Sequence, residues 1–299
     1  MGVALIAIAL LVLAPAASAK PKPKPKADLV VTHAKVFGTN YAFAGTTANI
    51  DLKDTVENEG AGTAGPSVNE LTLRHADETF KDLTRKVPKL KKDERSSGRE
   101  TVEITIPADA KLGEYTAILC ADARDDVEEK HELNCKVAGE FYIAKKKWTG
   151  TFAGGFDDKS GPAESWGATD ANFAFQSYQG DGVFIYGVQA TVVYEIASTG
   201  GSCIYSGSGV DGGPIGFLRL DYRPAYYSAL VRHHEEFSYP IFEDCGDGPH
   251  LYSDGPLTAA VLEISKPGGG QPLPFGTTTL TGSQVAILEP NANFTWNLK

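Results

Sequence analysis

The chain has 299 residues, of which 42% are hydrophobic and 22% charged, and its formal net charge at pH 7 is −10. These proportions are typical of a globular protein and exclude a disordered chain, and the length predicts about two domains. Residues 27–143 and 148–299 both contain more acidic than basic side chains. A nucleic-acid partner is therefore not expected, because phosphate binding requires a basic face.

The first 26 residues predict an export signal followed by a spacer. Residues 2–13 form an uncharged apolar run, and the small residues Ala17-Ser18-Ala19 follow it as at a signal cleavage site. We therefore expect residues 1–19 to be a signal peptide and the protein to be secreted or envelope-associated; the run is too short for a transmembrane span. Residues 20–26, KPKPKPK, predict an extended polyproline II spacer, whose lysines either stay solvated or contact an anionic surface.

Residues 27–143 show the alternation of half-buried β-strands. Ile50, Leu52 and Val56 alternate with polar neighbours, and so do the apolar residues between 102 and 106. Together with the shorter apolar runs they predict about seven strands and no long helix. The predicted strands are 29–36, 49–56, 71–73, 80–87, 101–106, 115–121 and 137–143. Seven short strands separated by turn residues predict an immunoglobulin-like sandwich.

Two local patterns add detail to this sandwich. Residues 57–67, ENEGAGTAGPS, follow a predicted strand, and we expect them to carry the chain from one sheet to the other. Gly60, Gly62 and Gly65 are expected to supply positive φ values for that crossing. The segment around Gly113 and Tyr115, LGEY, resembles a tyrosine corner, in which the phenol hydroxyl bonds the backbone upstream.

Four motifs in this half resemble a known family. They are DLVV at 28–31, VENEGAGTAGPS at 56–67, IPADAKLGEYTAILCAD at 106–122, and the hairpin positions Asp122, Val127, Glu129, Glu132 and Asn134. This set resembles CARDB, the cell-adhesion-related domain found in bacteria, although Asp125, His131 and Cys135 stand where that family usually has Asn. The resemblance covers residues 27–143. It implies an immunoglobulin-like domain of a surface or secreted bacterial protein, usually beside another functional module, and it implies no catalysis.

The four cysteines predict two disulfide bonds. None of them lies in a CxxC pair, and four cysteines allow three pairings. An antiparallel hairpin centred on residues 127–128 would set Cys120 beside Cys135, which leaves Cys203 to pair with Cys245. Each bridge then stays within one domain, and disulfides fit an extracellular address.

The second half of the chain predicts another antiparallel β domain. Residues 144–147, AKKK, are expected to form a basic linker, and residues 148–299 contain all three tryptophans and most of the tyrosines. Strand-like runs occur at 183–196, 202–207, 215–222, 226–232, 257–265 and 293–298. We expect the last strand to pack beside the first, at about residues 148–152, in either a closed barrel or a jelly-roll-like sandwich.

The aromatic residues of this half predict a binding face. Tyrosine and tryptophan rings on an exposed sheet stack on sugars or pack on partner proteins. The candidates, which lie in polar or turn-like contexts, are Trp166, Tyr178, Tyr226 and Tyr227. The expected partner is a cell-envelope polysaccharide or a surface protein; the alternative is that the rings are simply core.

Metal ligands are sparse, and no cofactor is expected apart from calcium. Asp122, Asp125 and Asp126, with two nearby glutamates, could supply oxygen ligands to calcium. They lack the regular Asp/Asn spacing and glycine of a calcium loop, so a solvated acidic hairpin is the alternative. His233 and His234, followed by two glutamates, are the densest group of other ligand types, but no third ligand follows at a recognisable spacing.

These patterns predict a protein that binds and does not catalyse. The sequence contains no nucleophile motif, and its cysteines are expected to be bridged. We expect residues 27–143 to be a presenting scaffold and residues 148–299 to bind a glycan or a protein. The alternative is a secreted hydrolase or metal-dependent enzyme whose active site lies in residues 148–299.

Overall fold

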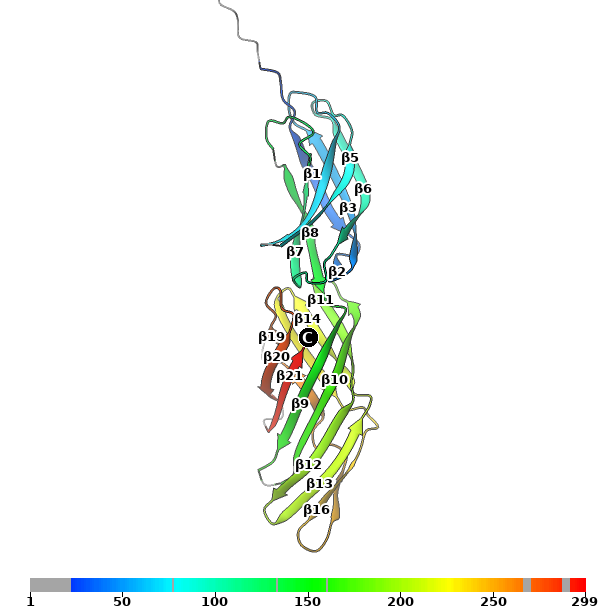
Figure 1. Ribbon diagram of the computed structural model, residues 1–299, viewed down its shortest axis with the longest axis vertical. Helices are drawn as coiled ribbons and strands as arrows, with labels where there is room; N and C mark the ends of the chain where they lie inside the picture. The colour runs from blue at the N-terminus through cyan, green and yellow to red at the C-terminus, as the bar shows by residue number, and fades with distance from the viewer. Residues whose placement is uncertain (1–22, 77, 133, 160, 266–269, 287–290) are drawn as a thin grey trace, which may run out of the picture.

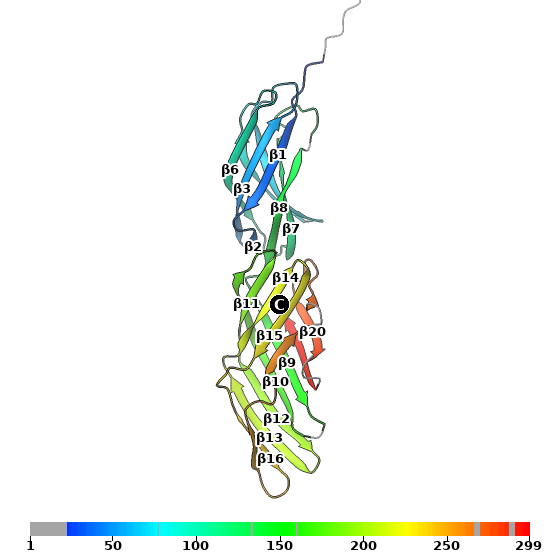
Figure 2. The same ribbon diagram turned by 180° about the vertical axis from the view of Figure 1, so that it is seen from behind.

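The computed structural model places two β domains end to end along one long axis (Figures 1 and 2). It describes residues 23–76, 78–132, 134–159, 161–265, 270–286 and 291–299. Every regular element in those ranges is a β-strand, as the sequence predicted, and no helix there could cross a membrane. The predicted signal peptide and residues 20–22 of the predicted spacer lie outside the described residues.

The N-terminal domain is a sandwich of two sheets. Its strands are β1 (Leu29–Phe37), β2 (Tyr41–Phe43), β3 (Thr47–Asn58), β4 (Ser67–His75), β5 (Glu78–Val87), β6 (Arg95–Thr105), β7 (Gly113–Cys120) and β8 (Cys135–Ala144). One sheet has the order β1-β3-β6 and the other β2-β8-β7-β4-β5. The seven predicted strands are all present. The eighth, β2, has only three residues and too short an alternation to be detected.

The crossing predicted for ENEGAGTAGPS is confirmed, but the reason for its glycines is different. The segment leads from β3 in one sheet to β4 in the other. Gly60, Gly62 and Gly65 do not have positive φ values. A Cβ on Gly60 or Gly62 would instead overlap the backbone of residues 25–28. The Gly62 N–H donates to the Lys26 carbonyl at 2.8 Å, so the end of the predicted spacer is part of this domain.

The tyrosine corner is also present. Tyr115 is fully buried, and its hydroxyl lies 2.8 Å from the Lys111 carbonyl oxygen and also contacts Glu78. The ring therefore fixes the entry into β7 to the turn that precedes it.

The close backbone approach at Gly62 predicts a large effect of one methyl group. Gly62→Ala should lower the free energy of unfolding by about 1–3 kcal/mol, because the added Cβ overlaps the Pro25 carbonyl. Gly65→Ala is the matched control, since its nearest atom lies 3.9 Å away on Val127. Urea unfolding of both variants measures the difference, and equal effects would contradict this role of Gly62.

The C-terminal domain contains the remaining strands. They are β9 (Lys147–Asp157), β10 (Ala163–Tyr178), β11 (Val183–Gln189), β12 (Val192–Gly200), β13 (Cys203–Asp211), β14 (Ile215–Tyr222), β15 (Ala225–Arg232), β16 (Pro240–Asp244), β17 (His250–Asp254), β18 (Ala260–Ile264), β19 (Gln271–Pro272), β20 (Leu280–Val285) and β21 (Ala292–Leu298). The predicted run 183–196 is two strands, with the break after Gln189.

The long strand β10 organises this domain as one branched sheet. One edge of β10 pairs with β9, while the other pairs first with β12 and then with β11. The path from β12 continues through β13 and β16 to β17, and the path from β11 continues through β14 and β15 to β18. As predicted, β21 pairs with β9. The sheet curls until Trp296 on β21 donates to the Tyr227 hydroxyl on β15 at 3.1 Å. Among the described strands, β17, β18, β19 and β20 each pair on one side only, so the sheet is an open half-barrel and not the closed barrel of the first alternative.

The predicted basic linker is not a free tether. Residues 144–147 span the end of β8 and the start of β9, and Ala144 is fully buried. Tyr41 of the N-terminal domain lies 4.6 Å from Tyr178 and 5.9 Å from Phe175 of the C-terminal domain, measured between ring centroids. Contacts between the domains also include His75 and Phe275, whose rings stack at 3.4 Å. The two domains therefore share an aromatic junction.

This junction predicts coupled stability of the two domains. Tyr41→Ala should lower the free energy of unfolding by about 2–4 kcal/mol, because it removes a ring packed against aromatic residues of both domains. It should also speed trypsin cleavage after Lys145 to Lys147. Tyr252→Ala, at a ring that is 48% exposed, is the control. Wild-type protein cut rapidly at these lysines into two stable fragments would contradict a rigid junction.

Candidate functional site

Two of the four predicted ligand-binding rings are buried. Trp166 is 3% exposed, and its indole N–H donates to the Val261 carbonyl at 2.7 Å. Tyr227 is 4% exposed and accepts the hydrogen bond from Trp296. Neither ring has an open face on which a sugar could stack, so the prediction is wrong for these two residues.

The other two rings lie apart from each other. Tyr178 belongs to the domain junction, where its hydroxyl donates to Asn40 Oδ1 at 2.9 Å. Tyr226 is half-buried on β15, beside Pro272 of β19. The structure therefore does not assemble the four candidates into one platform. The aromatic residues of this domain mostly form its core, which includes Trp148, Phe152, Phe173, Tyr186, Tyr194 and Phe294.

The structure does not gather further ligands around the histidine pair among the described residues. His233 and His234 follow the end of β15 and lie outside any strand. The His234 backbone N–H donates to the buried Asp211 carboxylate at 2.8 Å. Among the described residues, neither histidine belongs to a group of three closely spaced potential ligands.

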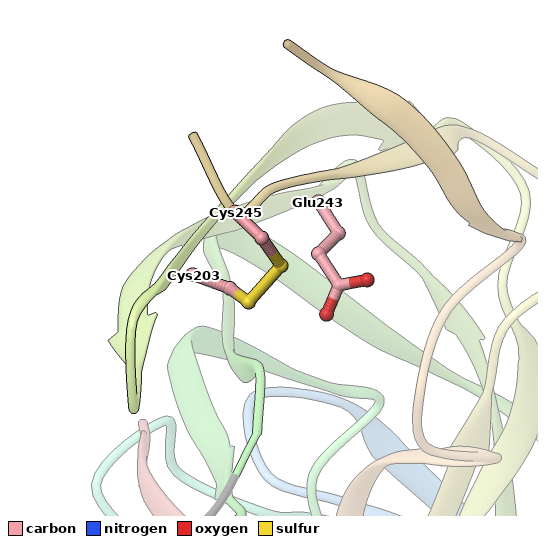
Figure 3. Close-up of side chains that lie close together, drawn as sticks. All are labelled: Cys203, Glu243 and Cys245. Carbon is pink, nitrogen blue, oxygen red and sulfur yellow. A yellow bond between two sulfur atoms is a disulfide. The ribbon is translucent and has the colours of Figure 1, made fainter. Parts of the chain in front are cut away.

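The one such group within the described ranges is Cys203, Glu243 and Cys245 (Figure 3). Its two sulfur atoms are bonded to each other, and a disulfide cannot supply the thiolate that a metal ion needs. Glu243 instead accepts a 2.6 Å hydrogen bond from the Tyr205 hydroxyl, and this bond raises the pKa of Tyr205 to about 12. These three residues therefore lie close together because a disulfide joins the ends of β13 and β16, and not because they hold a metal ion.

Both predicted disulfides are present. Cys120 pairs with Cys135 across β7 and β8, in the hairpin that the sequence indicated. Cys203 pairs with Cys245 across the ends of β13 and β16. No free cysteine remains among the described residues.

The acidic hairpin is held by its own backbone and does not gather around a cation site. Asp122 is buried and accepts hydrogen bonds from the N–H groups of Asp126 and Val127 at 3.0 and 2.9 Å. Asp125 and Asp126 are exposed. The described carboxylates of this hairpin include no set of three within ligand distance of one another, so the arrangement favours the alternative to calcium.

Glu129 ties the hairpin to β1. Its Oε2 accepts hydrogen bonds from the Leu29 N–H at 3.2 Å and from Asn134 at 3.0 Å, while the buried Oε1 has no hydrogen-bond partner among the described residues. Burial, with smaller contributions from the charges of Asp122 and Glu132, raises the pKa of Glu129 to about 7. The adjoining Asp28 carboxylate contacts His131 and Asn134.

Glu129 should make the protein less stable as the pH rises. The pKa of Glu129 is higher in the folded protein than in the unfolded chain. Its contribution to the free energy of unfolding is therefore fully present below about pH 4.5 and declines until the pH passes about 7. Glu129→Gln should remove about 2 kcal/mol of pH dependence between pH 5 and pH 8. Urea unfolding of both proteins across this range measures the change. Glu128→Gln, at a side chain that is 80% exposed, is the control. The same pH slope in wild type and Glu129→Gln would show that Glu129 does not titrate there.

The outer face of the C-terminal sheet extends across seven paired strands. Strands β20, β21, β9, β10, β12, β13 and β16 lie side by side across the lower half of Figure 1. The ladder registers place Thr295, Ala153, Gly167, Val193 and Val210 in one row across five strands. The adjacent row is Asn293, Gly155, Ser165, Glu195 and Ser208. A row of small and aliphatic groups thus runs beside a mostly polar row.

Two hollows on this face form one groove. The first has a volume of about 520 Å³ and is lined by residues of β21, β9, β10 and β12. The second has a volume of about 490 Å³ and extends to β13 and β16. They share Val193 and Glu195, and Glu195 is the one charged residue among the described lining of both. We call this feature the outer groove.

Sequence reasoning missed the outer groove because it searched for aromatic side chains. The available signal was the opposite one: serine, threonine, asparagine, glycine and alanine alternate with the buried aromatics in β9, β10 and β21. Small residues between large inward ones leave the outer side of a sheet hollow.

Comparison with known proteins supports the family resemblance for one part of the chain. Residues 26–138 match the CARDB family model. The match covers most of the N-terminal domain and stops before β9. No curated protein matches this chain.

Proposed function

We propose that this protein is a secreted or cell-surface binding protein of a bacterium, in which the CARDB domain presents the C-terminal domain to a ligand. The CARDB match supports an adhesion-related role. The two disulfides are compatible with an extracellular location.

One observation carries the assignment of roles, namely the outer groove. It is a long hollow on an open sheet face of the C-terminal domain. In Figure 2 this domain lies at the opposite end of the molecule from the start of the CARDB domain. The shared aromatic junction supports a rigid presentation, because the groove keeps a fixed direction relative to the CARDB domain.

A binding function without catalysis accounts for the groove better than an enzyme does. Within its described lining, Glu195 is the sole titratable side chain apart from a buried tyrosine, Tyr194, so no acid and base face each other across it. General acid–base chemistry needs two such groups near the reacting atoms. We therefore expect adsorption without turnover.

A blocking experiment on the full chain tests this assignment. A single cysteine is introduced at exposed Thr295 on β21 or at exposed Thr105 on β6 and capped with a maleimide polymer. Adsorption to bacterial envelopes should be lost when residue 295 is capped and retained when residue 105 is capped.

Three outcomes would overturn the proposal. The reverse blocking pattern would assign binding to the CARDB domain. Failure of the uncapped chain to adsorb to any envelope would reject a binding function. Release of soluble fragments from the envelope would show that the protein is an enzyme.

A further inference from the structure

The outer groove is long enough to hold an extended polymer chain. Its two hollows follow each other across strands β21 to β16, and they meet at Val193 and Glu195. The row from Thr295 to Val210 crosses four inter-strand steps, which amounts to about 19 Å at a spacing of about 4.8 Å. This length exceeds what a single small molecule needs.

The outer groove is amphipathic, because the row of small and aliphatic residues lies beside the mostly polar row. Ala153, Gly167 and Val193 form a low apolar floor, while Ser165, Glu195 and Ser208 stand beside it. A sugar ring has an apolar C–H face and a rim of hydroxyl groups. A chain of such rings can place its C–H faces on the floor and its hydroxyls against the polar row.

The polar groups suit an uncharged partner. Glu195 is the one charged side chain in the described lining, although the acidic side chains of residues 148–299 far outnumber the basic ones. An anionic polymer would meet a negative domain with no cation in the groove to pair with it. Hydroxyls such as Ser165 and Thr295, whose contacts to backbone carbonyls are long at 3.4 and 3.3 Å, keep lone pairs that can accept hydrogen bonds from a glycan.

A protein partner fits the groove less well. Centres of protein interfaces are enriched in aromatic residues, methionine and arginine. Among the lining residues, Phe242, at the far end of the groove, is the one aromatic ring with substantial exposure, 38%. The other exposed lining side chains are mainly small or hydroxylated, with Val193 and Pro240 as the larger apolar ones and Glu195 as the one charge.

We propose that the outer groove binds an extended, uncharged polysaccharide chain. This inference rests on the proposed binding function and specifies its ligand. The polymer lies across β21, β9, β10, β12 and β13 with its sugar rings over Ala153, Gly167 and Val193.

The test is a binding assay of the full mature chain on defined polymers. The neutral probes are soluble β-1,3-glucan and oligosaccharides of cellulose and chitin; the anionic probes are polygalacturonate and dextran sulfate. At least one neutral probe should bind, and the anionic probes should bind at least about tenfold more weakly.

Variants that fill the groove locate the site. Ala153→Gln and Ser165→Gln each place a longer side chain on one row, and each should weaken binding by at least about tenfold. Thr105→Gln, on the exposed side of β6 and outside the groove, should leave binding unchanged. Melting temperatures within a few degrees of wild type show that each variant is folded.

The outcomes separate this inference from the proposed function. Preferential binding of an anionic probe, or neutral binding that survives both filling variants, would overturn the inference. If no polymer binds but envelope adsorption is still blocked by the cap at residue 295, the groove takes a protein and only the inference fails. If adsorption is absent as well, the proposed function fails with it.

Discussion

The pleat of the C-terminal sheet imposes the constraint on which its core and its open face both depend. Successive side chains of a strand point to opposite faces, so large residues at alternate positions leave the positions between them to the other side. In β21, Phe294, Trp296 and Leu298 point inward and are nearly fully buried. Thr295 and Asn297 consequently point outward, and the same relation in β9 and β10 leaves Ala153 and Gly167 beside them. One alternation thus builds an aromatic core and a hollow outer face together.

In the CARDB domain, the backbone of the inter-sheet segment packs directly against the backbone of the N-terminal segment. Gly60 and Gly62 allow the inter-sheet segment to pass directly against residues 25–28, and the Asn58 side chain closes the same contact by bonding the backbone on both sides. Glu129 then holds the acidic hairpin to the start of β1. Positions that match the family motifs therefore join the N-terminal segment, the crossing and the hairpin at one end of the sandwich, far from the outer groove (Figure 1).

The junction converts two domains into one elongated unit. Tyr41 and Phe43 pack against Phe175, and the Tyr186 hydroxyl donates to the Lys145 carbonyl at 2.8 Å. A connection of two residues between β8 and β9 leaves no slack for independent movement. In the proposed function this stiffness would fix the direction in which the CARDB domain presents the outer groove.

The sequence by itself determined the all-β class, the seven main strands of the first domain, the crossing at ENEGAGTAGPS, the tyrosine corner and both disulfides. All but one of these depend on local alternation, turn chemistry or short separations along the chain, which a single sequence contains. The exception is the bridge between Cys203 and Cys245, which are 42 residues apart and were left to pair once Cys120 and Cys135 were assigned. It did not reveal that Trp166 and Tyr227 are core residues, because which side of a strand is covered depends on how the sheet curls. The role of Gly62 and the rigidity of residues 144–147 were likewise decided by segments that approach from elsewhere, such as Pro25 and Tyr41. The outer groove was also decided by the tertiary structure. Its rows contain residues as far apart in the sequence as Ala153 and Thr295, and only the pairing of their strands brings them side by side.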